Sequence, residues 1–192
     1  MTTIATDGKT IAGDGLRTFC DEITGTNHKK IRIVDGKIYT FTGSAALFSP
    51  AIKWYAVGAN LKALPKAEDN HWVLVVIDQS GITRITSAMP WPEQFDPPFC
   101  LGAGEDFALG AMRAGLSPEE AVRLTAKHFT HTGGEIQVVN IAEALGIVKP
   151  NGVDLHEDPP SSQQQGFSPD QARQNGAAGD AYRPSAGHPV QA

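Results

Sequence analysis

The chain has 192 residues, of which 41% are hydrophobic and 19% charged, as in an ordinary globular protein with room for one sizeable core. Its net charge is only -5 and its basic residues are scattered, which argues against a surface that binds nucleic acid. No apolar run reaches bilayer-spanning length and the N-terminus does not resemble a signal peptide, so we expect a cytoplasmic protein without a membrane partner.

Three β-hairpins are predicted in the first half of the chain. Their strand pairs are 2–6 with 9–13, 30–34 with 37–42, and 72–77 with 82–86. Asp7-Gly8 and Asp35-Gly36 join the first two pairs, and Asp-Gly is typical of tight turns with positive φ. The strand 72–77 is apolar enough to be buried on both faces.

Helices are predicted between and after these hairpins. The expected elements are a helix over 45–61 with Pro50 in its first turns, a proline-rich loop over 89–98, a helix over 105–114, a helix from a Ser117-Pro118 start to 127, a strand over 136–140 and a short helix to 145. Because strands and helices do not alternate, the order favours antiparallel sheets covered by helices rather than a parallel sheet.

The folded domain is expected to cover residues 2–149. Six of the thirteen prolines, a Ser/Gln tract and few apolar residues follow, over 150–192. Such a segment buries too little apolar surface to offset the entropy of ordering. We therefore expect a disordered tail.

Neither cysteines nor histidines form a metal-ligand pattern. Cys20 and Cys100 allow at most one disulfide, and we interpret both as structural or incidental. His128 and His131 lie three apart but have no carboxylate or cysteine at ligand spacing. We expect no metal and no cofactor.

Thr2 follows the initiator methionine, and a small second residue favours removal of that methionine. The freed α-amine, with a pKa near 7.7 to 8.0, accepts the hydroxyl proton of its own residue at cellular pH. Alone, however, such a threonine is most often an ordinary strand residue.

Asp14 and Lys30 give Thr2 its chemical context. Asp14 stands between two glycines at the end of the second strand, where the backbone approaches a neighbouring strand closely. A lysine near the Thr2 hydroxyl favours its deprotonated form and lowers the pKa of the amine, and Asp14 would hold the lysine in place.

The alternation of side chains along the strand that begins at Lys30 decides which lysine is expected to face Asp14. Ile31 and Ile33 face one side, so the period of two places His28, Lys30 and Arg32 on the other, with Lys29 in the apolar register. Gly43 follows the next strand at a strand-to-helix turn, where its amide is a candidate oxyanion donor.

These motifs together resemble a known family. Segments 2–4, 12–18, 29–31, 42–46, 102–104 and 132–134, in this order and spacing, are similar to proteasome β-type subunits and the bacterial HslV peptidase over residues 2–142. The resemblance implies an α+β fold, the four-layer αββα sandwich of N-terminal-nucleophile (Ntn) hydrolases. It also implies stacked homo-oligomeric rings of six or seven subunits that degrade peptides or unfolded proteins, and leaves open whether an ATP-dependent unfoldase feeds them.

The resemblance also assigns roles to residues. The catalytic residues it implies are Thr2, Asp14, Lys30 and Gly43. The expected substrate-binding residues are Arg17, Thr18, His28, Arg32, Phe41 and Ala45. The family usually has serine at Ala103 and aspartate at Phe129, and both support the N-terminal amine; Thr132 keeps a hydroxyl at the third supporting position.

Three functions remain open from the sequence. A threonine endopeptidase is favoured, because the attacking and oxyanion-forming groups are present. A catalytically silent ring subunit with an assembly or scaffold role is compatible with Ala103 and Phe129. A small-amide hydrolase on the same scaffold is the third reading, since nucleophile and fold do not fix the substrate.

Overall fold

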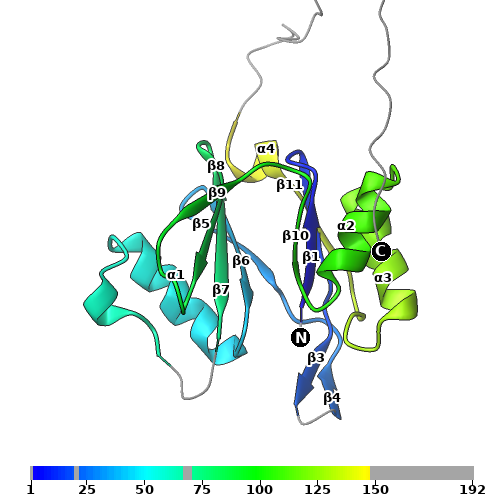
Figure 1. Ribbon diagram of the computed structural model, residues 1–192, viewed down its shortest axis with the longest axis horizontal. Coiled ribbons are helices and arrows are strands. Elements are labelled where there is room, and N and C mark those ends of the chain that lie inside the picture. The colour runs from blue at the N-terminus through cyan, green and yellow to red at the C-terminus, as the bar shows by residue number, and fades with distance from the viewer. Residues whose placement is uncertain (1, 20–21, 67–70, 148–192) are drawn as a thin grey trace, which may run out of the picture. The chain divides into compact units, whose positions relative to one another are not determined.

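Two antiparallel sheets stack face to face in the structure, a computed structural model that describes residues 2–19, 22–66 and 71–147 (Figure 1). The first, here called the N-terminal sheet, has the strand order β10 (Phe99–Gly102), β1 (Thr3–Thr6), β2 (Thr10–Gly13) and β11 (Gln137–Asn140). The second, here called the large sheet, has the order β5 (Ile31–Val34), β6 (Lys37–Thr42), β7 (Val73–Asp78), β8 (Gly81–Thr86) and β9 (Glu93–Phe95).

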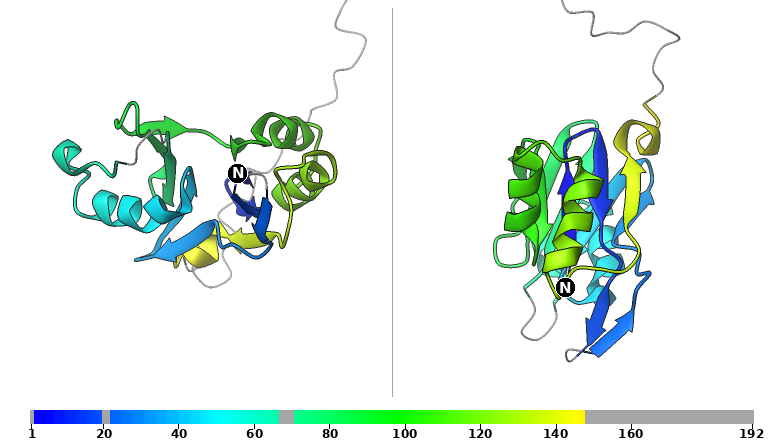
Figure 2. Two further views of the ribbon diagram at one scale, coloured as in Figure 1. Left: turned by 90° about the horizontal axis from the view of Figure 1, so that it is seen from below. Right: turned by 90° about the vertical axis from the view of Figure 1, so that its right-hand side faces the viewer.

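Helices cover the outer face of each sheet. A 3₁₀ turn over Ala45–Leu47 leads into α1 (Phe48–Ala56), which lies on the large sheet, and a second turn spans Leu61–Ala63. On the other side, α2 (Glu105–Arg113) and α3 (Pro118–His128) lie together over the N-terminal sheet (Figure 2). The short α4 (Ile141–Ala144) follows β11. The predicted four-layer αββα sandwich of antiparallel sheets is therefore confirmed.

Side-chain alternation in β1 and β2 supplies residues to two separate cores, one on each face of the N-terminal sheet. Ile4 and Ile11 point between the sheets, where Ile38, Val75 and others meet them. Their neighbours Ala5 and Ala12 point outward to α2 and α3. A period of two places successive side chains on opposite faces. The small alanines let the helices pack closely against this face.

The core under α1 is largely aromatic. Trp72 is 1% exposed, its ring lies against Phe41 and Trp54, and its indole N–H donates to the carbonyl of Pro65 at 3.0 Å. Because a buried Trp needs a partner for its N–H, this bond completes its burial. Truncating such a side chain costs about 3 to 5 kcal/mol. The wall behind the end of β6 is thus a well-packed aromatic core.

The two Asp-Gly turns differ. At Asp35-Gly36 both residues have positive φ, 49° and 68°, as the predicted tight turn requires. At the first hairpin only Gly8 has positive φ, 85°, and the Asp7 carboxylate accepts the N–H groups of Lys9 and Thr10. The prediction of a tight primed turn there is wrong, because the Asp7 side chain organises a longer loop.

Two strands and a hairpin were not expected from the sequence pattern. β3 (Arg17–Phe19) pairs with β4 (Glu22–Gly25), β9 lies inside the proline-rich stretch, and β10 pairs with β1. The register of β10 puts Gly102 opposite Thr3. This pairing places Ala103, the residue after β10, beside the beginning of β1.

The two helices over the N-terminal sheet begin and end as their sequences indicate. In α3 the Ser117 hydroxyl accepts the Glu120 N–H, and the Glu120 carboxylate accepts the Ser117 N–H, so the predicted capping box is confirmed. α2 ends before Gly115, whose φ is 100°. Among the residues that the structure describes, no helix combines the length and apolarity needed to cross a membrane. The predicted tail over 150–192 and Cys20 lie outside the described residues.

Candidate active site

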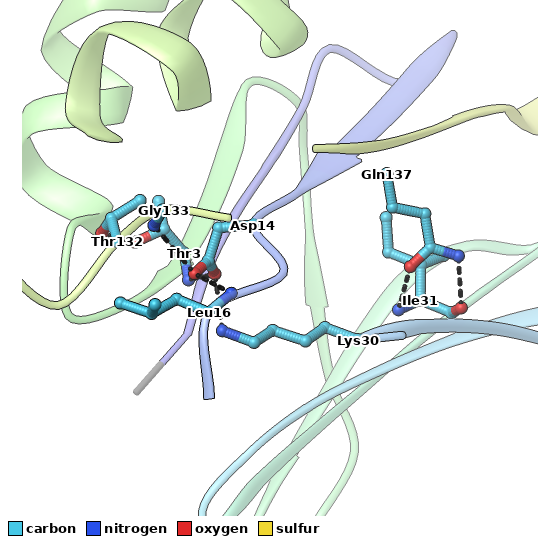
Figure 3. A network of polar contacts seen from close by, with 8 residues as sticks. All are labelled: Thr3, Asp14, Leu16, Lys30, Ile31, Thr132, Gly133 and Gln137. Atoms are coloured by element: carbon cyan, nitrogen blue, oxygen red, sulfur yellow. Dashed lines mark hydrogen bonds and ion pairs between the residues drawn. The ribbon is translucent and has the colours of Figure 1, made fainter. Parts of the chain in front are cut away.

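A buried carboxylate forms the centre of the site. Asp14 is 0% exposed, and its Oδ1 accepts the Thr3 N–H at 2.7 Å and the Lys30 ammonium at 2.8 Å (Figure 3). Its Oδ2 accepts the N–H groups of Leu16 at 3.2 Å and Gly133 at 3.3 Å. A buried charge is tolerated only when it is paired and hydrogen-bonded, and Asp14 satisfies both conditions.

The hairpin of β1 and β2 brings Asp14 to the first residues of the chain. The Asp14 N–H donates to the Thr3 carbonyl at 3.1 Å, while the Thr3 N–H donates to the Asp14 side chain. This reciprocal pair continues the β1–β2 ladder by one residue beyond Gly13. The carboxylate is therefore fixed relative to the residue that follows Thr2.

Lys30 reaches this carboxylate from the other sheet. It stands immediately before β5, its side chain is 5% exposed, and it extends toward the N-terminal sheet (Figure 3). Burial lowers the pKa of Lys30, while Asp14 opposes this shift by its charge and hydrogen bond. Lys30 is buried beside Asp14, whereas Lys29 is exposed. The expected alternation does not account for this, because Ile31 also lies between the sheets, while Arg32, expected on the same face as Lys30, contacts Phe48 and Ser49 of α1.

Gln137 holds the backbone beside Lys30, a role that no sequence pattern indicated. From β11, its amide oxygen accepts the Ile31 N–H at 3.1 Å and its amide nitrogen donates to the Ile31 carbonyl at 2.8 Å (Figure 3). The side chain therefore bridges the two sheets as a short strand would. This clamp fixes the start of β5, from which Lys30 extends.

A cavity of about 330 Å³ opens next to this network. Thr2, Lys30 and Gly43 line it together, as do five of the six residues expected to bind substrate, namely Arg17, Thr18, His28, Phe41 and Ala45. The remaining lining residues, which sequence reasoning did not identify, are Leu16, Phe19, Ser44, Ala46 and Phe48. Asp14 lies beneath the cavity and reaches it through Lys30.

Thr2 is held by its backbone at one end of the cavity. It is 8% exposed, and its carbonyl accepts the Ala103 N–H at 2.8 Å. The β1–β10 ladder therefore extends to the first described residue. Thr2 sits in a defined position rather than at a loose chain end, and the N-terminal end of β1 lies at the same end of the sheets as β3 and β4 (Figure 1).

Gly43 occupies a position that only glycine fits. Its φ is 123°, and a Cβ there would lie 2.8 Å from the Cβ of Trp72. The left-handed region and the close approach both exclude an ordinary side chain. Without a side chain, the Gly43 backbone borders the cavity directly, at the end of β6.

Arg32 differs from the other expected substrate-binding residues. Its Nη1 donates to the Ser49 hydroxyl at 2.7 Å, and its guanidinium lies 4.2 Å from the centre of the Phe48 ring. Phe48 lines the cavity, whereas Arg32 does not. Arg32 therefore stands behind the aromatic wall and acts on the cavity through its charge.

His28 reports the electrostatics of the cavity. Burial lowers the pKa of His28, and the positive charges of Lys30, Arg17 and Arg32 lower it further, with only Asp14 opposing them. The neutral imidazole is favoured because a second positive charge would be repelled. The surroundings of His28 are thus electropositive.

The three positions expected to support the Thr2 amine have other contacts. The Thr132 hydroxyl lies 2.6 Å from the hydroxyl of Thr3. Phe129 is 39% exposed, and its ring centre lies 6.3 Å from that of Phe107. Ala103 contributes its backbone N–H to the Thr2 carbonyl. Thr132 therefore braces β1 through Thr3, and the expected contact with Thr2 is replaced by this one.

The other reactive groups do not form a second centre. Burial, with the Glu105 charge adding to it, raises the pKa of the Cys100 thiol to about 12, so this thiol stays protonated and is a poor nucleophile. His128 packs against the ring of Phe107. Within the described ranges no three His, Cys, Asp or Glu side chains gather as metal ligands would.

Comparisons with known proteins identify the fold. The chain superposes on HslV from Trypanosoma brucei with a TM-score of 0.57 and 16% identity, covering 73% of this chain and 99% of that one. It also superposes on BPH from Thiobacillus denitrificans, with a TM-score of 0.56, 22% identity, and coverage of 73% and 97%. A structure of BPH in complex with epoxomicin matches with a TM-score of 0.54, 20% identity, and coverage of 73% and 98%.

These matches are structural alone. Neither a protein-family model nor a curated protein sequence matches the chain. The fold is that of HslV and BPH, as the resemblance in the sequence implied.

Proposed function

We propose that this chain, which has the fold of proteasome-type peptidases, is a threonine endopeptidase whose nucleophile is Thr2 after removal of Met1. The observation that carries the proposal is the placement of Thr2 and Lys30 on one cavity, with Lys30 paired to the buried Asp14. A nucleophile, a nearby cation and a fixed orienting carboxylate are the parts that hydroxyl activation requires.

The chemistry follows from these groups. The α-amine of Thr2 takes the hydroxyl proton, and Oγ1 bonds to the carbonyl carbon of the substrate. The Lys30 charge favours the ionised oxygen, and the Gly43 N–H is the proposed donor to the oxyanion. The C–N bond then breaks and the amine passes its proton to the leaving group. Water, deprotonated by the same amine, hydrolyses the ester on Thr2 and restores the hydroxyl.

The proposed substrates are peptides or unfolded protein segments, degraded in the cytoplasm inside a homo-oligomeric stacked ring. The similarity to HslV and BPH supports this assembly. Two apolar side chains of the β3–β4 hairpin, Phe19 and Ile23, are 71% and 65% exposed, and such residues favour contacts with another protein surface. An ATP-dependent unfoldase is a further proposed partner, supported by the same similarity alone.

A silent ring subunit is the second candidate. It is favoured by three contacts: the Thr132 hydroxyl is hydrogen-bonded to that of Thr3, Phe129 packs on Phe107, and Ala103 offers only its backbone N–H. An amine acts as a base only while it is held neutral and aimed. The two candidates differ in whether Thr2 reacts.

The test combines intact mass, peptide hydrolysis and probe binding. We expect purified protein to lack Met1, and Thr2→Ala to lower peptide hydrolysis by at least about 10³-fold while the protein stays folded and assembled, because the hydroxyl forms the bond to substrate. Thr130→Ala, at an exposed threonine, is the matched control. Epoxomicin, present in one BPH complex, is a suitable ligand whose binding should require Thr2.

Two results would decide against the peptidase. Full activity in protein that retains Met1 would remove the amine mechanism. Assembled protein with Met1 removed that neither hydrolyses peptides nor reacts with a threonine-directed covalent probe would favour the silent subunit.

A further inference from the structure

The charges that surround the cavity are unbalanced. Arg17, His28 and Lys30 line it, and none of the described residues that line it is acidic. The nearby carboxylate, Asp14, is buried beneath Lys30 and already accepts four hydrogen bonds. Lys30 and Asp14 therefore largely cancel, which leaves the charge of Arg17 facing the cavity.

Two arginines carry this excess charge. Arg17, on β3, and Arg32, on β5, enter none of the ion pairs formed among the described residues. Both act on His28 in the same direction as Lys30. Guanidinium groups that have no carboxylate partner concentrate positive potential in a nearby concave surface, because low-dielectric walls focus the field.

The rest of the cavity sets its size and shape. Phe41 and Phe48 stack with ring centres 5.4 Å apart and form its aromatic wall. The Arg32 guanidinium also packs on the Phe48 ring. A volume of about 330 Å³ accommodates a side chain together with part of an extended backbone. The methylene groups of a ligand can therefore pack on the aromatic wall while its polar end meets the cations.

We propose that this cavity selects a carboxylate, namely the side chain of a glutamate or aspartate whose own carbonyl Thr2 attacks. The inference rests on the proposed function, since Thr2 defines which substrate residue lies next to the cavity. Arginine binds carboxylates through a planar pair of donors, and such charge-assisted bonds are stronger than neutral ones. A lysine side chain at the same place is repelled by Arg17 and Arg32.

The kinetic test uses fluorogenic peptides that differ only in the residue before the cleaved bond: Glu, Gln, Leu or Lys. We expect kcat/KM for the Glu peptide to exceed that for the isosteric Gln peptide by about tenfold or more, with the Lys peptide poorest. Arg17→Gln and Arg32→Gln should each reduce the Glu-to-Gln ratio. Arg113→Gln, at an exposed arginine on α2, should leave the ratio unchanged. Added salt should also reduce it, since Arg17 is exposed.

A binding test separates this inference from the proposed function. The same peptides are titrated into assembled Thr2→Ala protein, which has no nucleophile, and binding is followed by fluorescence anisotropy. Tighter binding of the Glu peptide than of the Gln peptide, by about tenfold, supports carboxylate selection whether or not the natural protein turns peptides over. Selective binding without turnover by the natural protein would contradict the peptidase and keep the carboxylate site.

His28 gives a second readout. A bound carboxylate opposes the three cations, so the pKa of His28, followed by its ring resonances, should rise when the Glu peptide binds and should not rise with the Gln peptide. Equal binding of the two peptides, or a ratio unaffected by both arginine substitutions, would overturn the inference. Selection of a Leu peptide bearing a free C-terminal carboxylate over its amide would show that the cations bind a chain end, and would overturn the side-chain assignment.

Discussion

Two adjacent lysines have opposite environments in this structure. Lys30 has a side chain 5% exposed and lies 2.8 Å from the Asp14 carboxylate. Lys29 has a side chain 56% exposed and lies 3.6 Å from the carboxylate of Glu135, which is 55% exposed. The chain thus forms a buried and a surface ion pair from neighbouring residues just before β5.

The contrast shows what burial adds to an ion pair. Desolvation is expensive, so a buried pair contributes little net stability and removing one partner leaves an uncompensated charge. An exposed pair is screened by water and contributes about 0 to 1 kcal/mol. The buried pair is therefore the one whose charge acts on its surroundings with little screening, and it is the pair beside Thr2.

The largest expected effect separates the two lysines directly. Lys30→Ala should lower turnover by at least about 10²-fold, because the cation near Thr2 is lost. It should also lower the free energy of unfolding by about 3 to 5 kcal/mol, since Asp14 keeps its charge without its partner. Lys29→Ala should change stability by less than about 0.5 kcal/mol and leave turnover intact.

Urea unfolding and peptide hydrolysis, measured on the same samples, check both numbers. Turnover is compared at equal folded fraction, so that instability is not mistaken for lost chemistry. Equal effects of the two substitutions would refute the assignment of Lys30 to the site.

An intermediate effect is expected from the clamp that holds the start of β5. Gln137→Ala removes both hydrogen bonds to Ile31, so it should lower stability by about 1 to 3 kcal/mol. It should also lower kcat by about tenfold with a smaller change in KM, because Lys30 is then less well positioned. Gln79→Ala, in the exposed turn after β7, is the control. A loss of stability with unchanged kcat would reduce Gln137 to a structural role.

The smallest expected effect concerns the sparse support of the amine. Ala103→Ser adds a hydroxyl to the residue whose backbone N–H donates to the Thr2 carbonyl. We expect turnover to rise by about threefold or less, because water can already supply the hydrogen bonds. Stability should stay within about 1 kcal/mol, since Ala103 is exposed. Slower hydrolysis than in an Ala142→Ser control would show that this position does not support an amine.

The sequence predicted those parts of the fold whose signals are local. The three hairpins, the capping box at Ser117 and the layer order follow from turn residues, caps and alternation. β10 was missed because Phe99–Gly102 is only four residues long and directly follows a proline-rich stretch. Its partner, β1, lies almost one hundred residues earlier, as the pairing of Thr3 with Gly102 shows, and no local pattern encodes such a pairing.

The site was predictable to the same extent. Lys30 does lie beside Asp14 and Gly43 stands at the expected turn beside the cavity. The strand period did not foresee the faces, because Arg32 lies against Phe48 of α1 rather than on the side of Lys30. The Gln137 clamp was not foreseeable, because an amide at that position looks like any half-exposed strand residue until the two sheets are stacked. Thr132 was expected near Thr2, and a difference of one residue along β1 decided its actual partner, Thr3.

The four donors to Asp14 become available at different times during synthesis of the chain. Leu16 follows Asp14 by two residues, whereas Gly133 follows it by 119. During synthesis from the N-terminus, Thr2, Asp14 and Lys30 all emerge long before the segment that completes the carboxylate's hydrogen bonds, and contacts so distant in sequence form late. A nascent or partly folded chain therefore lacks a complete site. Any hydrolytic activity is acquired only on complete folding, when the chain is no longer an unfolded substrate for other copies of itself.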